Sequence, residues 1–507
     1  MKFKISMVLF GVVALVITSC KKQLDLDINT DPNNPNLEQL TPKLVFPAAV
    51  VSSASRIGGD LSIVGSMWAQ YYTQGTTAGQ YKNIDAFDLS KTFGNTNRGV
   101  AWIELFAGAL NDYHFITTKA KASGDWNYFL LGTVMKAYTY QVLVDLYDKV
   151  PYTQAFQGAD NLQPQFDDGY TVYKGLLAEI DTALSKDFNA STITSPGLTD
   201  FVFPDTDANW HVDPWIQFAN TLKLKMYLRM VYAKPAEAEA GIKKLYADGA
   251  EFLEEDAILD IYEDASDKRN PLYTYAFQET SSDNLRASFT YLSWLLTNSD
   301  PRVNDYFGKD ANTPPNNSTG YLAIHQGDYD NPATALNGAS KALVLATDPV
   351  DFITLAESHF LQAEALERFF NGAGAKAHYD AGVTAAFARY GDNASTFIAA
   401  GGKYAYPSTG TFEQKLEAII VQKWASFPRT HGIEGYFERN RTGYPKTSPV
   451  YSTDPSYIPG QFVYPIAGVT NGLFPKRLIF PDLETSKNAN APTDEPLTKK
   501  VWWDVKQ

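Results

Sequence analysis

The chain has 507 residues, a formal net charge of −14 and a sequence pI of about 5.0. An acidic balance without a cluster of Lys and Arg argues against a nucleic-acid partner and against attraction to anionic lipid head groups. Hydrophobic residues make up 44% of the chain, which is ample for a large core. The single cysteine excludes a disulfide framework, so stability must come from packing.

The first 19 residues resemble a lipoprotein signal peptide. Lys2 and Lys4 precede an apolar run over residues 5–17, which is too short to span a bilayer comfortably as a helix. The run ends in Ile-Thr-Ser before Cys20, the order that lipidation of a cysteine thiol requires. A plain signal peptide with an incidental cysteine is the alternative. We expect a mature chain that begins at Cys20 and is anchored to a membrane without crossing it.

Residues 20–36 are polar and rich in Asp, Asn and Pro, which predicts a lipidated flexible tether. The alternating acidic residues over 25–31 are similar to a calcium loop. Thr30 and Asn36, however, stand where that loop needs glycine and a bidentate glutamate. Turn-forming side chains explain the pattern better, and we expect no metal here.

Residues 37–507 show no linker-like break and predict a single, mainly α domain with little strand. Apolar residues recur at three- and four-residue spacing in seven segments, which indicates helices. These segments are 100–121, 126–147, 169–187, 213–232, 351–371, 375–390 and 411–426. Their lengths favour packed helical hairpins. Between them lie Gly-, Asn-, Pro- and Tyr-rich stretches at 73–99, 190–212, 308–349 and 441–498, and such long loops are usually functional.

Motifs for catalysis are absent from the sequence. The six histidines form no HExxH pair, and neither a G-x-S-x-G elbow nor a phosphate-binding loop occurs. Glu357 and Glu364 share one helical face and could suggest glycoside hydrolysis, but one helix seldom places two carboxylates on either side of a bond. A solvated or hydrogen-bonded helix face is the preferred interpretation. We therefore expect no catalytic residue, no cofactor and no metal.

Binding has better candidates in a polar Gly/Thr loop bracketed by rings. Carbohydrate recognition needs flat aromatic faces together with amide and charged groups for the hydroxyls. The candidate ligand-binding residues are Trp68, Gln70, Tyr71, Tyr72 and Tyr81, with a second cluster at Phe93, Asn95 and Arg98. The alternative is that Trp68 and Tyr71 lie on a buried helix face. Trp210 and Trp215 flank a helix start and are interpreted as structural.

Several segments together resemble the SusD/RagB family of outer-membrane lipoproteins. They are INTDPN at 28–33, VDLYDKVPY at 144–152, WIQFANTLKL at 215–224, DPRV at 300–303, AE and QAEA within 356–365, RTGYP at 441–445 and PKRLIFP at 475–481. Their order covers nearly the whole mature chain. Gln362 departs from the usual arginine or leucine, which we interpret as a tolerated surface change.

The resemblance implies tetratricopeptide-like helical pairs that support a ligand face rich in long loops. It also implies a partner, a SusC-like TonB-dependent outer-membrane transporter. The leading hypothesis is thus a cell-surface, lipid-anchored protein of the outer membrane that captures oligosaccharides and is not an enzyme. A peptide-capturing member of the same family is the second hypothesis. A lipid-anchored glycoside hydrolase and a purely structural helical scaffold are weaker alternatives.

Overall fold

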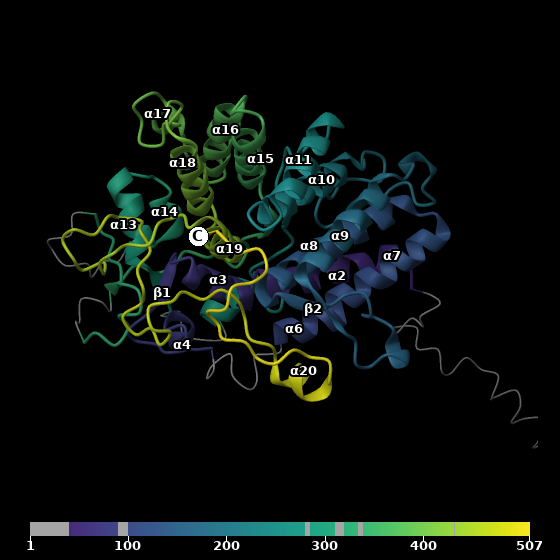
Figure 1. Cartoon of the computed structure of the whole chain (residues 1–507), viewed down its shortest axis with the longest axis horizontal. Coiled ribbons are helices and arrows are strands. Elements are labelled where there is room, and N and C mark those ends of the chain that lie inside the picture. Colours follow the sequence, from purple (N-terminus) through teal and green to yellow (C-terminus); the bar gives the residue numbers. More distant parts are fainter. Residues whose placement is uncertain are drawn as a thin grey trace, which may run out of the picture.

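The computed structural model describes residues 40–89, 100–278, 284–309, 319–332, 338–429 and 431–506. The predicted signal peptide at 1–19, Cys20 and the tether at 20–36 lie outside the described residues. Helices dominate the molecule, and a long C-terminal stretch of loops crosses one side of them (Figure 1). The prediction of a mainly α fold with little strand is confirmed.

Eighteen α-helices are described. They are α2 (Pro42–Ile57), α3 (Asp60–Trp68), α4 (Lys82–Asp85), α6 (Val100–Glu104), α7 (Asn111–Ser123), α8 (Trp126–Tyr147), α9 (Gly169–Leu184), α10 (Asp213–Arg229), α11 (Pro235–Ala247), α12 (Pro271–Tyr273), α13 (Phe289–Asn298), α14 (Val303–Tyr306), α15 (Leu355–Phe369), α16 (Ala375–Ala388), α17 (Ser395–Ile398), α18 (Phe412–Ala425), α19 (Gly432–Thr442) and α20 (Asp482–Lys487). A π-helical turn at Leu105–Leu110 joins α6 to α7. All seven segments with helical spacing contain helices.

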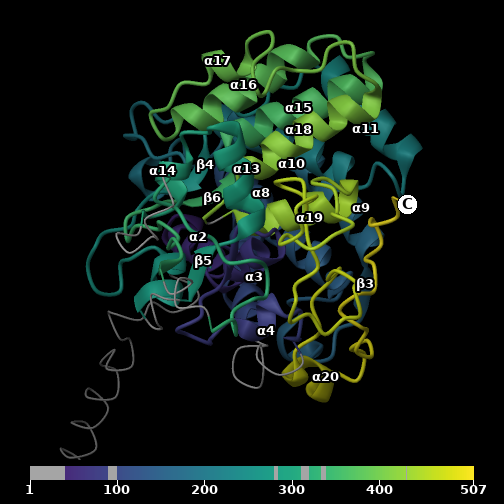
Figure 2. The same ribbon diagram turned by 90° about the vertical axis from the view of Figure 1, so that its left-hand side faces the viewer.

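Consecutive helices pack as hairpins, as the helical spacing predicts. Gly124 ends α7 in the left-handed conformation, and the Asp125 carboxylate then accepts a hydrogen bond from the backbone N–H of Tyr128 at the start of α8. A turn through Gly372 and Gly374, both with positive φ, joins α15 to α16. The two helices lie side by side in both ribbon views (Figures 1 and 2).

The helix α8 lies at the centre of a group of helices that includes α7, α9 and α10. All its residues except Trp126 and Lys136 are buried, so it is enclosed on every side and packs against α7, α9 and α10. The start of α10 is fixed nearby, because the indole N–H groups of Trp210 and Trp215 both donate to the Asp200 carboxylate at 2.9 and 2.6 Å. The prediction that these two tryptophans are structural is confirmed.

Six short strands pair in three small antiparallel sheets. The pairs are β1 (Tyr72–Gln74) with β5 (Leu285–Ala287), β2 (Lys149–Pro151) with β3 (Phe166–Asp168), and β4 (Ala257–Leu259) with β6 (Val350–Ile353). Tyr72 of β1 pairs with Ala287 at the end of β5, and α13 follows β5 directly along the chain. The sheet β1–β5 therefore ties the N-terminal helices to the helix that forms one wall of the site described below.

A second feature of the interior is a buried ion cluster that joins α8, α10, α15, α18 and α19. It consists of Lys225, Arg229, Lys423 and Arg441 with Asp145, Glu357, Glu364, Glu434 and Glu438. Arg441 contacts Glu364 at 2.6 Å and Glu438 at 2.5 Å, and Arg229 contacts Asp145 at 3.0 Å. Every member is buried, so each charge depends on a partner within the protein.

The ion cluster corrects two expectations about α15. Glu357 and Glu364 do not form a solvated face, because both carboxylates are fully desolvated and paired with Lys225 and Arg441. Gln362 is also buried, so the interpretation of this departure as a surface change is wrong. The sequence also offered a hydrogen-bonded helix face as the interpretation of this pair, and both carboxylates are indeed hydrogen-bonded.

Candidate functional site

The rings that the sequence singled out lie in the core. Trp68, Tyr71 and Tyr72 are at most 2% exposed. The Trp68 indole N–H donates to the Ile84 carbonyl at 3.1 Å, and the Tyr71 hydroxyl donates to the Trp424 carbonyl at 2.7 Å. Their polar atoms thus have partners within the fold. The expectation that these three rings face a ligand is corrected, because Trp68 ends α3, which buries all of its residues but the first, and Tyr71 and Tyr72 continue from it into the core.

The remaining predicted residues are also internal where the structure describes them. Gln70 is fully buried, and its carbonyl oxygen accepts hydrogen bonds from Thr290 Oγ1 at 2.8 Å and from the Val463 backbone N–H at 3.1 Å. Tyr81 is buried and donates to the Tyr275 carbonyl at 2.9 Å. Both are framework residues, contrary to the prediction. Phe93, Asn95 and Arg98 lie outside the described residues.

These framework rings support a neighbouring pocket. Tyr71 stacks on Trp424 with ring centroids 5.5 Å apart, and Trp424 in turn lies edge-on to Trp294 at 5.9 Å. Tyr71 is followed directly by β1, whose partner strand β5 leads to α13. Tyr71, which the sequence singled out, is therefore a buried ring of this stack. Trp294 is the ring of the stack that lines the pocket.

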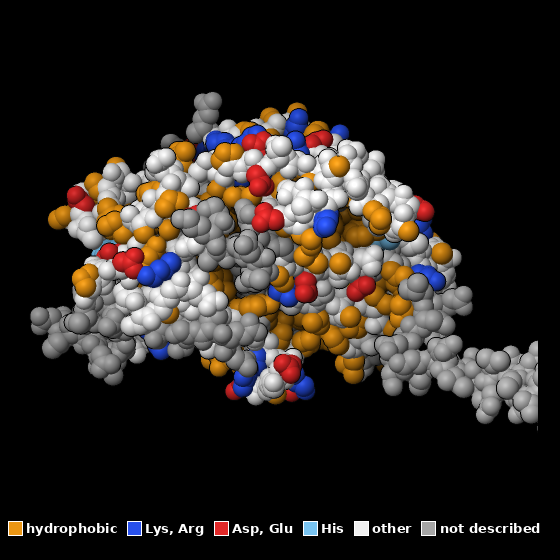
Figure 3. Space-filling view, turned by 90° about the horizontal axis from the view of Figure 1, so that it is seen from below, with side chains coloured by type: hydrophobic (Ala, Val, Ile, Leu, Met, Phe, Trp, Pro, Cys, Tyr) orange, Lys and Arg blue, Asp and Glu red, His pale blue; other side chains and the backbone are white. Residues whose placement is uncertain are grey.

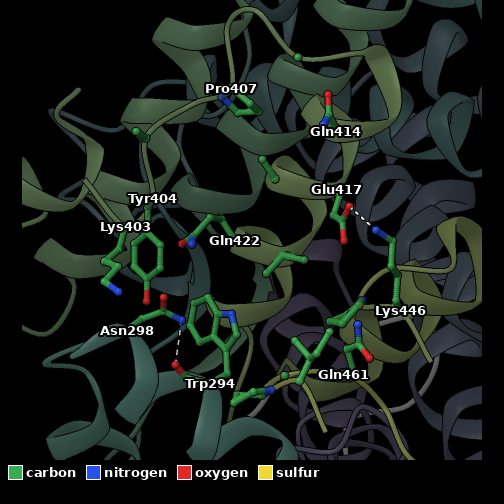
Figure 4. A pocket seen from close by; sticks show the side chains of 18 of the residues that line it. Trp294, Asn298, Lys403, Tyr404, Pro407, Gln414, Glu417, Gln422, Lys446 and Gln461 are labelled. Atoms are coloured by element: carbon green, nitrogen blue, oxygen red, sulfur yellow. Dashed lines mark hydrogen bonds and ion pairs between the residues drawn. The ribbon is translucent and has the colours of Figure 1, made fainter. Parts of the chain in front are cut away.

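The pocket has a volume of about 650 Å³ and lies between α13, α18 and three loop segments (Figure 4). Trp294 and Asn298 come from α13, and Gln414, Glu417 and Gln422 come from α18. The loops contribute Lys403, Tyr404, Pro407, Pro445, Lys446 and residues 458–461. This mixture of rings and amides defines what we call the ring-and-amide pocket. Two of its segments belong to the long loop at 441–498 that the sequence predicted to be functional.

One wall of the pocket is a pair of parallel rings. Trp294 and Tyr404 stack with centroids 5.3 Å apart and an angle of 3° between their planes. The Tyr404 hydroxyl donates to Asp300 at 2.7 Å, which fixes the ring. Gly460 closes over Trp294, since its φ is +88° and a Cβ there would lie 2.5 Å from Trp294 Cδ1. The wall is consequently held in place from several sides, and only a small part of it is open, since Trp294 is 8% and Tyr404 4% exposed.

Polar groups without partners point to a ligand. The side-chain oxygens of Gln422 and Gln461 are buried and accept no hydrogen bond from the described residues. Gln422 is 3% exposed, and its amide points to the side of the pocket where Tyr404 and Asn298 lie (Figure 4). A buried amide oxygen with no donor costs free energy unless a water or a ligand supplies one. These two oxygens can therefore accept a hydrogen bond from a water or from a ligand in the pocket.

Charge is confined to the outer rim of the pocket. Glu417 and Lys446 form an ion pair of 2.7 Å across α18 and the loop that follows α19, and both side chains are partly exposed. Lys403 is exposed on the opposite loop. Glu417 is the one carboxylate among the described lining residues. The interior offers rings and neutral amides, which suits an uncharged ligand that carries hydroxyl or amide groups.

A half-buried ring cluster continues from the pocket along the loops. Phe289 at the start of α13 contacts His325 with centroids 4.3 Å apart and Tyr457 at 5.9 Å. His325 lies 6.0 Å from the ring of Tyr451, and its Nδ1 bonds to Ser452 Oγ at 2.8 Å. Tyr457 directly precedes the 458–461 segment of the pocket. An extended ligand can thus meet further rings beside the pocket.

The arrangement does not match the requirements of glycoside hydrolysis. That chemistry uses two carboxylates on either side of the scissile bond. The ring-and-amide pocket offers Glu417 alone among its described residues. Glu357 and Glu364, the pair that the sequence suggested, are held in the buried ion cluster and do not line the pocket.

Sequence reasoning missed Trp294, Tyr404 and Gln422. The pair Trp294 and Asn298, four residues apart on one helix, was a usable signal for a ring beside an amide. Gln422 carried no such signal, because a single glutamine in an amphipathic helix normally faces solvent.

A family model described as starch-binding and associating with the outer membrane, SusD-like, matches residues 33–465. The chain belongs to the SusD-like family. This match spans α2 through α19 and confirms the resemblance seen in the sequence motifs. Carbohydrate binding and association with the outer membrane are properties of the family, of which lipoproteins with signal peptides are typical.

Solved structures show the same fold. A chitin-binding SusD homolog from Flavobacterium johnsoniae is 22% identical, covers 91% of this SusD-like chain and 99% of its own, and gives a TM-score of 0.72. A SusD homolog from Bacteroides uniformis is 19% identical over 91% and 99% of the two chains, with a TM-score of 0.70. A SusD-like protein from Bacteroides thetaiotaomicron is 20% identical over the same shares, with a TM-score of 0.69. No curated protein matches the chain.

Surface properties agree with the composition. Seen from below, charged side chains of both signs are scattered among apolar and uncharged ones without a single-signed patch (Figure 3). Within the described part of the chain, no helix is long and apolar enough to cross a membrane.

Proposed function

We propose that this SusD-like protein binds an oligosaccharide in the ring-and-amide pocket at the cell surface and delivers it to a SusC-like TonB-dependent transporter. The family supports the carbohydrate class and the outer-membrane setting. The pocket supports the site. Flat faces from Trp294 and Tyr404 suit the apolar C–H side of a sugar ring, and the amides suit its hydroxyl groups.

The observation that carries the proposal is the unpartnered oxygen of Gln422 beside the stacked rings. A site built to hydrogen-bond a ligand hydroxyl or amide rejects ligands that lack the donor, since the buried acceptor is then left unpaired. The chitin-binding SusD homolog from Flavobacterium johnsoniae and the starch-binding family name make chito- and malto-oligosaccharides the first ligands to test.

Isothermal titration of the mature chain with Cys20→Ser tests the ligand class. The panel contains chito-, malto- and xylo-oligosaccharides of two to six units, with a set of basic and neutral tetrapeptides alongside. Saturable binding of one glycan series supports the proposal. Binding of peptides alone supports the peptide-capturing alternative, and release of shorter sugars from a bound glycan supports a hydrolase.

The substitution Gln422→Leu tests the site. It keeps the side-chain volume but removes the amide, so glycan affinity should fall by about tenfold or more while the protein stays folded. Gln362→Leu is the matched control, because Gln362 is also a buried helical glutamine but does not line the pocket. Equal affinity in both variants would place the binding site elsewhere.

Anchoring and partnership have separate tests. Cys20→Ser should release the protein from the membrane fraction, because acyl chains on the first mature residue are the proposed anchor. Co-purification from solubilised outer membranes should recover a TonB-dependent transporter with the lipidated form. A protein that remains membrane-bound without Cys20 contradicts the anchor, and recovery without a transporter contradicts the partnership.

A further inference from the structure

Two histidines contact each other between the helices α15 and α16, and they are not part of the proposed glycan site. His359 and His378 approach through their Nδ1 atoms, which are 3.2 Å apart, with ring centroids separated by 5.4 Å. Neither residue lines the ring-and-amide pocket. The two rings come from neighbouring helices of one hairpin and are both partly exposed.

The contact between the two rings is a hydrogen bond in which one Nδ1 donates and the other accepts. Two rings protonated at Nδ1 would point their hydrogens at each other, so at least one of the two Nδ1 atoms carries a free lone pair. Each ring keeps Nε2 for a second contact, and neutral imidazole is the form that binds a metal.

The distance between the nitrogens fits a metal bridge. Zinc–nitrogen bonds are about 2.0–2.1 Å, and two such bonds at a tetrahedral angle hold their nitrogens about 3.3 Å apart. A metal bound at that angle lies to one side of the line between the two nitrogens, so each ring must turn away from its partner to direct its lone pair at the ion. The helix hairpin thus presents two ligands at nearly the required separation before any ion arrives.

We propose that His359 and His378 form a two-histidine site for a divalent transition-metal ion of the Zn²⁺, Cu²⁺ or Ni²⁺ class. Imidazole suits these ions better than it suits Mg²⁺ or Ca²⁺, which prefer oxygen. The ion replaces the shared hydrogen as the bridge. The ring that donated this hydrogen loses the proton at Nδ1 and takes one up from solvent at Nε2, so both rings stay neutral and no net proton is released. It cross-links α15 to α16, the two helices of one tetratricopeptide-like pair.

The site leaves coordination positions open. Within the described residues no group of three or more His, Cys, Asp or Glu side chains could hold a metal together. Water or an external donor therefore completes the coordination, and the affinity for a free aqueous ion is correspondingly modest. An open site of this kind also accepts an ion that arrives with part of its own ligand shell.

Copper binding followed by electron paramagnetic resonance tests the proposal. The protein is the mature chain with Cys20→Ser and without a histidine tag, titrated with Cu²⁺. We expect one equivalent whose spectrum shows coupling to two imidazole nitrogens. His359→Ala and His378→Ala should each weaken binding by at least tenfold and lose the two-nitrogen signal. Absence of stoichiometric binding in the wild type, or unchanged binding in either variant, overturns the proposal.

Controls separate the site from background and from misfolding. His114→Ala removes a half-buried histidine whose ring contacts Phe156 and no second imidazole, so Cu²⁺ binding should be unchanged. His359→Gln keeps a side chain of similar size and should behave like His359→Ala if the fold is intact. Zn²⁺ should also raise the melting temperature of the wild type and of His114→Ala, but not of His359→Gln.

Discussion

The buried ion cluster and the ring-and-amide pocket lie on opposite sides of α18 and treat polar groups in opposite ways. In the cluster, Lys423 Nζ of α18 makes no hydrogen bond with the described residues, but it lies 3.5 Å from Glu357 and 3.4 Å from Glu438, so opposite charges compensate each other within the protein. In the pocket, Gln422 is just as buried but its oxygen has no partner among the described residues. Adjacent residues of one helix thus serve the scaffold and the site.

The comparison teaches how a buried polar residue can be assigned a role. A satisfied buried charge holds helices together, and its removal leaves a partner stranded. An unsatisfied buried amide facing a cavity weakens the fold slightly and is useful only when something binds. Substitutions in the ion cluster should therefore lower mainly the stability of the protein. Substitutions in the pocket should lower mainly its affinity for the ligand.

The largest loss of stability is expected from Arg441→Met. The substitution keeps most of the side-chain volume but leaves Glu364 and Glu438 facing each other without the guanidinium. The free energy of unfolding should fall by about 3–5 kcal/mol. Urea unfolding measures it, with the exposed pair Lys243 and Glu239 as control, where Lys243→Met should cost about 0.5 kcal/mol or less. A similar small loss for both variants would show that the cluster is not a structural support.

Trp68→Ala should cost about 3–5 kcal/mol as well, because the ring is buried and the change leaves a cavity. Glycan affinity of the folded fraction should be nearly unchanged. Thermal unfolding and titration together check this. A stable variant that has lost glycan binding would restore Trp68 as a ligand residue and contradict the burial seen here.

Acid should destabilise the scaffold through the cluster. Burial alone raises the pKa of Glu364, but the guanidinium groups of Arg441 and Arg368 outweigh it and lower the pKa to about 2. A carboxylate with a lowered folded-state pKa stabilises the fold fully above its unfolded value of 4.5, and this contribution is lost as pH falls toward 2. Urea midpoints between pH 5 and pH 2.5 should fall steadily.

Two buried carboxylates outside the cluster should stabilise the fold, and not destabilise it, as the pH falls. Burial raises the pKa of Asp60 and Asp85 to about 6, so each costs stability above pH 6, and this cost disappears as pH falls toward 4. Stability should therefore be level or rise slightly from pH 7 to pH 5 before it falls. A steady decline that begins near pH 6 would contradict these assignments.

Tyr404→Phe should have a small effect on both stability and binding. It removes the hydroxyl that donates to Asp300 but keeps the ring that stacks on Trp294. The free energy of unfolding should fall by about 1–2 kcal/mol, since the acceptor is a buried charged group. Glycan affinity should change by less than threefold. A larger loss of affinity would mean that the hydroxyl, not the ring face, contacts the ligand.

Much of the scaffold was predictable because its signals are local. Segment 126–147 coincides with α8, and the family motifs contribute Asp145, Glu364 and Arg441 to the ion cluster. The pocket was not predictable in the same way. It is assembled from α13 and from α18 with its neighbouring loops, which come more than 100 residues later in the chain. Hydrophobic spacing also carries no information about which of many tyrosines and tryptophans lies at a surface.

The predicted ring site failed for a physical reason. Trp68, Gln70 and Tyr71 have the composition of a sugar site, but Gly65 on α3 packs against the backbone of α19 so closely that a Cβ there would lie 2.3 Å from Ile433. That close packing buries the neighbouring rings on all sides. Exposure depends on contacts between distant segments, and composition does not contain them.

The central claim is that ligand binds between the Trp294–Tyr404 wall and the Gln422 amide. The most direct test is a crystal structure with the tightest-binding oligosaccharide of the titration panel. The account predicts a sugar ring stacked on Trp294, with a hydroxyl or amide donor within hydrogen-bond distance of Gln422 Oε1. An oligosaccharide bound at another face, with this pocket holding only water, would contradict it.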